Sequence, residues 1–323
     1  MKKYLLPQSG NFYKVNMHSH STLSDGKFTP EELKELYTEN GYSAIAFTEH
    51  NKLVDLSYLT DEKFVAITSY EIDITELNRP AYFMYDGEPK VKSHKETVHI
   101  NLYSRDPHKE TTVDISDIRN NYCVETINEA VRRAKSEGFI AVYNHPSWSL
   151  NTFDLYSKLE GLDGIEINNG ASNRSSDLDY TPYVYDQMAR CGKKLFCVGG
   201  DDNHQRHHFF TAWTMVKADS LSYDNLLNAL ESGNSYASDG PEIYELYVED
   251  GSVTVKCSEA VGVFLTTAGR RKASSLLETT GEPVTEATFK LDPNDIFFRI
   301  TVRDAKGKHA NTNIYYLDEI GVL

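Results

Sequence analysis

The sequence has few of the features that mark secreted or membrane proteins. Its four cysteines, Cys123, Cys191, Cys197 and Cys257, form no C-x-x-C pair, as expected of intracellular buried thiols rather than a disulfide framework. The amino-terminal stretch MKKYLLPQSG has only a short apolar patch before Pro7. A secretory signal needs an apolar region of about 7–15 residues. No apolar run reaches the ~20 residues of a membrane span. We therefore expect a cytoplasmic protein.

Positive charge is also scarce. The sequence contains 33 lysines and arginines and 48 aspartates and glutamates, so the formal net charge is −15. A field of this sign repels polyanions and argues against broad binding to polymeric nucleic acid or anionic membranes. A small anionic substrate would need a strong local positive charge, which bound metal ions could supply. With 323 residues, 40% of them hydrophobic, the chain can form one large globular domain and a small one.

The first two-thirds of the chain alternates strand-like and helix-like segments. A helix is predicted at residues 29–41, where Thr29 can cap it, Pro30 suits the first helical position and Gly41 can end it. Further helices are expected at residues 128–138, 182–192 and 222–233, and strand patterns occur at residues 13–20, 43–50, 63–73, 97–104, 139–148, 163–170 and 193–204. This alternation predicts parallel strands with helices outside, as a barrel or an open sheet. Residues 74–97 are predicted to be a hairpin-like insertion.

The pattern changes near residue 238. Beyond it, strand-like segments are joined by D-G and K-G turns, and no helical period is visible. We therefore predict two domains, residues 1–238 and residues 239–323, the second a small antiparallel β-sandwich.

Polar residues of metal-binding type follow the apolar runs of the first domain. They are His18, His20, Asp25, His50, Glu71, His99, His145, Asp202 and His204. In a (β/α) barrel, functional groups gather at the carboxyl ends of the strands. Burying so many imidazoles and carboxylates without partners would cost about 1–3 kcal/mol per group. A shared cluster of metal ions would satisfy them together, and mixed imidazole and carboxylate ligands suit Zn, Mn or Fe.

The order of these motifs, H-x-H, D-G, T-E-H, a Glu after a strand, V-H, H-P and D-x-H, resembles the polymerase and histidinol phosphatase (PHP) domain family over roughly residues 12–238. The resemblance implies a distorted seven-stranded (β/α) barrel that binds up to three divalent ions. It implies one ion at His18, His20, Glu71 and Asp202, a second at Glu71, His99 and His145, and a third at Asp25, His50 and His204. In GGDDNH, Asp201 stands where the family usually has a small residue. We take Asp202 as the ligand and Asp201 as the alternative.

The expected function is hydrolysis of a phosphate ester in a small metabolite or nucleotide, by attack of a hydroxide bound to two or three divalent ions (Zn, Mn or Fe). Arg174 and Arg206 are candidates for phosphate binding, and His207 or His208 for protonation of the leaving oxygen. The alternatives are an amidohydrolase-like enzyme that cuts a C–N bond at the same metal site, and a non-catalytic PHP regulatory module. The C-terminal part resembles a β extension of some PHP phosphoesterases and is expected to pack against the barrel or a partner.

Overall fold

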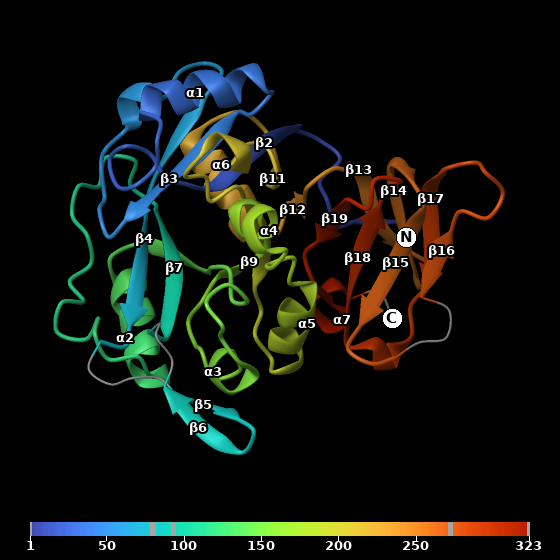
Figure 1. Cartoon of the computed structure of the whole chain (residues 1–323). Helices are drawn as coiled ribbons and strands as arrows, with labels where there is room; N and C mark the ends of the chain where they lie inside the picture. The colour runs from blue at the N-terminus through green and yellow to red at the C-terminus, as the bar shows by residue number, and fades with distance from the viewer. Residues whose placement is uncertain (1, 78–81, 92–94, 271–273, 322–323) are drawn as a thin grey trace.

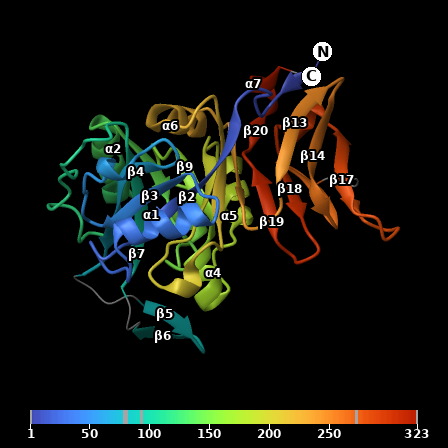
Figure 2. The same cartoon turned by 90° about the horizontal axis from the view of Figure 1, so that it is seen from above.

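The computed structural model describes residues 2–77, 82–91, 95–270 and 274–321. They form an α/β fold with one large mixed sheet, a separate antiparallel sheet and a two-stranded hairpin. Figures 1 and 2 show the longer helices around the first part of the chain, whereas the C-terminal part consists mainly of strands. Within the described residues, no helix combines the length and apolar character needed to cross a membrane.

The bounds of the elements are as follows. The helices are α1 (Pro30–Glu39), α2 (Val124–Ser136), α3 (Phe153–Tyr156), α4 (Gly170–Ser176), α5 (Pro182–Arg190), α6 (Tyr223–Glu231) and α7 (Leu317–Ile320), with short 3-10 turns η1 (Ser57–Leu59), η2 (Arg206–His208) and η3 (Pro293–Asp295). The strands up to residue 238 are β1 (Lys3–Tyr4), β2 (Asn11–Ser19), β3 (Ala44–His50), β4 (Val65–Thr75), β5 (Tyr82–Tyr85), β6 (Glu88–Val91), β7 (Thr97–Ser104), β8 (Phe139–Tyr143), β9 (Gly164–Asn169), β10 (Phe196–Gly200), β11 (Trp213–Ala218) and β12 (Ser235–Ser238). The later strands are β13 (Ile243–Glu249), β14 (Ser252–Ala260), β15 (Gly262–Thr267), β16 (Ser275–Leu277), β17 (Val284–Lys290), β18 (Phe297–Arg303), β19 (His309–Thr312) and β20 (Tyr315–Tyr316).

Three of the four predicted helices begin where the sequence predicts. At α1, Thr29 Oγ1 accepts from the backbone N of Glu32, and the Glu32 carboxylate accepts from the backbone N of Thr29. This capping box satisfies two amides that a helix start leaves unpaired. At α6, Ser222 Oγ accepts from the backbone N of Asn225. The helices predicted from residues 29, 182 and 222 are thus confirmed, and α2 begins slightly earlier than the segment predicted from residue 128.

The large sheet has the order β10-β9-β8-β7-β4-β3-β2-β11-β12-β19-β18-β15-β16. The strands β2, β3 and β4 are parallel to one another, as are β8, β9 and β10. The prediction of parallel strands is wrong for β7, which is antiparallel to β4 and β8. The strand β11, which lies outside the predicted strands, is antiparallel to β2.

The connection from β4 to β7 explains this direction. A parallel return needs a long crossover, usually a helix. The described residues between β4 and β7 instead contain β5 and β6, which pair antiparallel, so the predicted hairpin-like insertion is confirmed. This hairpin extends away from the rest of the fold (Figures 1 and 2). As a consequence, β7 starts at the edge where β3 and β4 end, and residues near its start lie at that edge.

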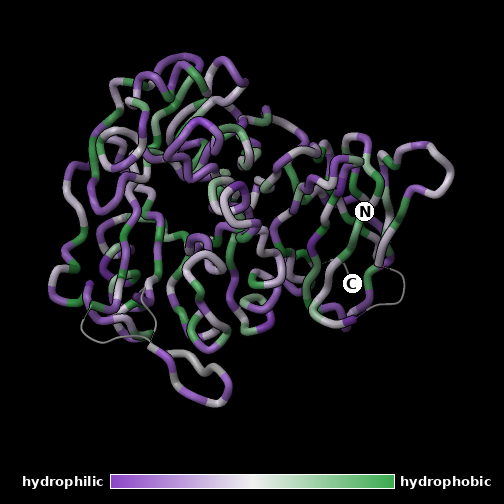
Figure 3. The backbone as a smooth tube through the Cα atoms, in the orientation of Figure 1, coloured by the Kyte–Doolittle hydropathy of each residue, from purple (hydrophilic) through white to green (hydrophobic). Residues whose placement is uncertain are grey.

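The C-terminal strands continue the large sheet. β12 pairs with β19, so sheet pairing crosses residue 238, and the short β1 pairs with β13 of the separate sheet β1-β13-β14-β17. One hydrophobic cluster contains side chains from both sheets, for example Leu246, Val255, Val263 and Ile300. Figure 3 shows hydrophobic stretches along the strands and hydrophilic ones in many outer turns. The division into domains at residue 238 stays a prediction.

Candidate metal centre

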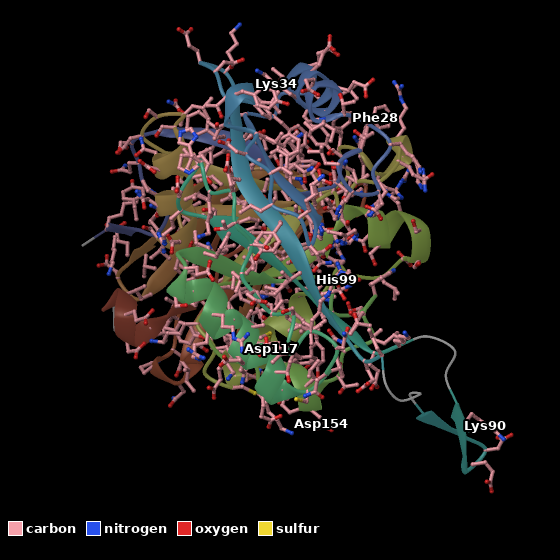
Figure 4. The ribbon with its side chains drawn as sticks, turned by 90° about the vertical axis from the view of Figure 1, so that its left-hand side faces the viewer. Phe28, Lys34, Lys90, His99, Asp117 and Asp154 are labelled. Carbon is pink, nitrogen blue, oxygen red and sulfur yellow. The ribbon has the colours of Figure 1, made fainter. Side chains whose placement is uncertain are left out.

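The structure brings all nine predicted polar side chains to one edge of the large sheet. They belong to separate segments: His18 at the end of β2 with His20 and Asp25 after it, His50 at the end of β3, Glu71 within β4, His99 near the start of β7, His145 after β8, and Asp202 and His204 after β10. His99 reaches this edge because β7 runs antiparallel to its neighbours. In Figure 4, His99 lies within the main body of the fold, whereas Lys90 lies on the hairpin that projects from it. That these residues bind metal ions stays a prediction.

The buried centre of the cluster consists of His18, His20, Glu71 and Asp202. The Nε2 atoms of His18 and His20 lie 3.2 Å apart. Asp202 Oδ1 lies 3.0 Å from His20 Nε2 and 3.4 Å from His18 Nε2. Glu71 Oε1 lies 3.5 Å from His18 Nε2, and Glu71 Oε2 lies 3.6 Å from His20 Nε2. Two imidazole nitrogens and two carboxylates thus converge on one small volume.

Two further groups of side chains flank this centre. On one side, Glu71 Oε1 lies 3.1 Å from His99 Nδ1 and 3.2 Å from His145 Nε2. On the other, Asp25 lies 3.6 Å from His50 and 3.3 Å from His204. Asp25 is 54% exposed and Glu71 1%, so the cluster is closed around Glu71 and open to solvent near Asp25.

These residues fit divalent metal ions. His20 Nδ1 and Glu71 Oε2 are buried without a hydrogen-bond partner among the described residues. His50 Nδ1 is 2.9 Å from Glu71 Oε2 but not in hydrogen-bond geometry. A buried polar atom left unsatisfied costs about 1–3 kcal/mol, and a metal ion would remove that cost. In four overlapping groups of these side chains, one ligand atom from each residue lies within 4.8 Å of the others.

Burial and charge act in opposite directions on the ionisable groups. Burial alone would lower the pKa of His145, but the carboxylates of Glu71 and Asp202 raise it to about 9. At His18 the carboxylates of Asp202, Glu166 and Glu71 together outweigh burial and raise the pKa well above the usual value. At His20 burial prevails and lowers the pKa to about 4. Neighbouring histidines hold the pKa of Glu71 well below its usual range, against the effect of burial. The carboxylates therefore stay ionised and attract cations, and metal ions would compete with protons for the imidazoles.

A buried carboxylate that sequence reasoning missed orients the centre. Glu166 in β9 is 1% exposed, and its Oε1 lies 3.1 Å from His18 Nδ1. Its Oε2 accepts from the backbone N of His145 at 3.2 Å and from Asn169 Nδ2 at 3.0 Å. Asn169 Nδ2 also lies 3.1 Å from Asp202 Oδ2. A carboxylate behind an imidazole fixes its tautomer and turns the opposite nitrogen toward a metal. A glutamate between Ile165 and Ile167 of a buried strand is the signal that the sequence offers.

The loop after β2 is held by a second missed carboxylate. Glu49, next to His50, accepts from the backbone N of Ser21 at 3.0 Å and from Ser21 Oγ at 2.5 Å, and it also accepts from Ser24 Oγ. The side chain is buried. Glu49 therefore fixes the loop that presents Asp25 to the cluster.

Of two adjacent aspartates, the structure places Asp202 in the cluster and Asp201 outside it. Asp201 is fully buried and accepts from Tyr37 Oη at 2.6 Å and from the backbone amides of residues 210–212. Asp202 has a φ of +48°, and this turn of the backbone directs its carboxylate to His20. Asp201 instead anchors the segment after η2.

Of the four residues predicted for phosphate binding and proton transfer, three are exposed and His208 is buried beside His204. Arg174, Arg206 and His207 are exposed, and within the described residues neither arginine pairs with a carboxylate. His208 is buried; its Nδ1 accepts from the backbone N of His204 at 3.2 Å. Burial and the neighbouring His207 lower the pKa of His208 to about 4. Their assignment to substrate binding and proton donation stays a prediction.

No model of a protein family matches the sequence, and no curated protein is significantly similar to it. Among solved structures, the chain is similar to a two-domain protein from Bacteroides vulgatus that contains a predicted PHP-like metal-dependent phosphoesterase, with 18% identity, 97% of this chain and 90% of that chain covered, and a TM-score of 0.47. A second is an amidohydrolase from Chromobacterium violaceum with bound sulfate and no metal, with 14% identity, 59% and 87% covered, and a TM-score of 0.39. A third is a candidate metal-dependent phosphoesterase from Bifidobacterium adolescentis, with 15% identity, 70% and 96% covered, and a TM-score of 0.36. Two of these three structures are thus described as metal-dependent phosphoesterases, one of them as PHP-like. Their TM-scores are low, so the functional conclusion depends on the geometry of the site.

Proposed function

We propose that the protein is a metal-dependent phosphoesterase that hydrolyses a small phosphorylated metabolite or nucleotide. The observation that carries the proposal is the surroundings of Glu71. Five imidazoles approach this one buried carboxylate: His18, His99 and His145 at Oε1, and His20 and His50 at Oε2. A carboxylate that serves two adjacent divalent ions needs such surroundings.

The proposed ligand sets follow the three parts of the cluster. His18, His20, Glu71 and Asp202 would hold one ion, Glu71, His99 and His145 a second, and Asp25, His50 and His204 a third. Zn, Mn and Fe suit this mixture of nitrogen and oxygen donors. When bound, such ions lower the pKa of a coordinated water and offset the charge that develops on phosphoryl oxygens.

The chain's own residues have three tasks in this proposal. Glu166 and Asn169 hold His18 and Asp202 in position through the contacts above. Glu49 fixes the loop that carries Asp25. The exposed side of the cluster, near Asp25 and His204, admits substrate and water, whereas the buried side excludes bulk solvent from Glu71.

We also propose that the seven strands from β10 to β2 form the distorted barrel. In support of closure, the backbone N of Asp202 donates to His18 O at 2.8 Å, and the backbone N of His20 donates to Asn203 O at 3.3 Å. Ser19 and Asn203 form a single parallel bridge. A Cβ on Gly200 would lie 2.6 Å from His18 Cβ, so a glycine permits this close approach of β10 to β2.

The test is a screen of chelator-stripped protein reloaded with Zn, Mn or Fe(II) against phosphomonoesters, cyclic phosphates, nucleotides and amides. We expect metal-dependent cleavage of a phosphate ester, abolished by Glu71→Gln and retained by Glu249→Gln, a matched change at an exposed position of β13. Cleavage of amides alone would favour the C–N hydrolase. Wild-type turnover by Glu71→Gln would contradict the assignment of Glu71.

A further inference from the structure

An exposed tryptophan stands beside the candidate metal centre. Trp148 is 49% exposed, and its ring centroid lies 5.2 Å from that of His145 and 5.6 Å from that of His99. Both contacts are edge-on, with interplanar angles of 81° and 63°. Within the described part of the chain, no ring stacks parallel to Trp148. A large aromatic surface therefore remains open next to two proposed metal ligands.

The backbone of Trp148 is fixed. The backbone N atoms of Ser147 and Trp148 donate to Asp179 Oδ1 and Oδ2 at 2.7 and 2.8 Å. Asp179 is 2% exposed, and it also accepts from Ser172 Oγ at 2.7 Å. A buried carboxylate thus fixes the backbone from which the exposed indole projects.

The same loop exposes further apolar surface. Leu150 is 54% exposed and Phe153 46%. Leu150 also has a φ of +56°, a conformation that a leucine rarely adopts. Exposed apolar side chains next to a polar site are typical of a surface that contacts a ligand. Trp148 flanks the part of the cluster formed by Glu71, His99 and His145, so the alcohol portion of an ester held there would lie within reach of the indole.

We propose that Trp148 stacks on a planar aromatic ring in the leaving group, so that the site selects phosphate esters that carry such a ring, for example a nucleobase. This inference rests on the proposed function for its catalytic part. An indole face offers stacking to any aromatic ring and needs no specific hydrogen bonds. Esters of open-chain or simple sugar alcohols would lack this contact and bind through the phosphate alone.

The first test measures binding rather than turnover. The chain has only two tryptophans, and the other, Trp213, lies beside Tyr42 and Lys14. In the zinc-loaded Trp213→Phe variant, Trp148 is the sole tryptophan reporter. We expect adenosine 5′-phosphate to quench the fluorescence of Trp148 immediately after mixing, with a concentration dependence that saturates. Ribose 5-phosphate should leave the fluorescence unchanged. The matched Trp148→Phe variant should show no such quench. An unchanged Trp148 signal, or equal quenching in both variants, would overturn the proposal.

The second test is kinetic. Trp148→Ala should raise KM for the nucleotide by about tenfold or more with little change in kcat, and Trp148→Phe should restore much of the loss. Hydrolysis of ribose 5-phosphate and the metal content should stay at wild-type levels. Equal losses on both esters would show a merely structural role and overturn the proposal. A saturable quench without cleavage of any ester would instead refute the proposed function and leave the stacking role of Trp148 standing.

Discussion

Glu166 and His18 form a buried pair, with Glu166 Oε1 3.1 Å from His18 Nδ1 and both side chains 1% exposed. The pair holds the proton of His18 on Nδ1 and directs Nε2 toward Glu71 and Asp202. It links β9 to β2, two strands that are distant in the order of the sheet.

Replacement of this carboxylate should weaken metal binding. In Glu166→Gln, an amide NH₂ would face either His18 Nδ1 or the backbone N of His145, and both of these positions require an acceptor. We expect a loss of about 10–100-fold in Zn²⁺ affinity, the usual range for such partners of metal ligands. Competition with a chromogenic chelator measures it, and Glu160→Gln, at an exposed position nearby in the chain, is the control. Unchanged affinity would refute the orienting role.

The adjacent aspartates should separate stability from metal binding. Asp201→Asn places an amide NH₂ among the donors of Tyr37 and residues 210–212, so we expect a loss of about 2–4 kcal/mol in unfolding free energy with metal content retained. Asp202→Asn should leave the stability of the metal-free protein near wild type and lower metal affinity. Urea unfolding and metal analysis test both variants, and the reverse pattern would mean that Asp201 is the ligand.

A buried ion pair joins the C-terminal strands to the first part of the chain, and its loss should lower the stability of the fold. Arg299 of β18 donates from Nε and Nη2 to Asp186 of α5 at 2.6 and 2.8 Å, and both side chains are buried. Asp186→Asn leaves a buried guanidinium without its charged partner and should cost about 3–5 kcal/mol. Glu319→Gln breaks the exposed pair with Lys194 and should cost less than about 1 kcal/mol. Urea unfolding measures both variants. A loss of unfolding free energy in Asp186→Asn as small as that in Glu319→Gln would contradict this role of the buried pair.

The C-terminal strands also reach toward the loop of Trp148. His309 of β19 stacks on Tyr180, with ring centroids 4.4 Å apart and planes 17° apart, and Tyr180 follows Asp179 in the chain. His309→Ala removes a stack worth about 0.5–1.5 kcal/mol. We expect faster hydrogen exchange at the amides of Ser147 and Trp148, with His108→Ala at an exposed position as the control. Unchanged exchange would show that the loop does not depend on the C-terminal strands.

The sequence predicts those parts of the fold that depend on local chemistry. The cap at Thr29 involves residues within one turn, so it can be recognised without the structure. The polar residues at strand ends are also recognisable, because each follows an apolar run. The direction of β7 depends on the connection that precedes it, and a hairpin-like insertion in place of a crossover helix was the available signal.

The contacts that orient the cluster join distant segments and could not be predicted from the sequence. Glu166 acts on His18, 148 positions away, and its spacing to neighbouring residues carries no sign of this role. The motif order favoured Asp202 over Asp201 for the cluster, but the bond of Asp201 to Tyr37 joins distant segments and could not be foreseen. Trp148 stands beside His145 in the sequence, but its exposure and its anchor at Asp179 exist only in the folded chain.

Calorimetric titration of chelator-stripped protein with Zn²⁺ tests the central claim most directly. The nine side chains should bind two or three ions per chain, and Glu71→Gln should lose at least one of them or bind about 100-fold more weakly. Heats no larger than those of dilution, or identical titrations for the wild type and Glu71→Gln, would contradict the claim that these residues form a metal centre.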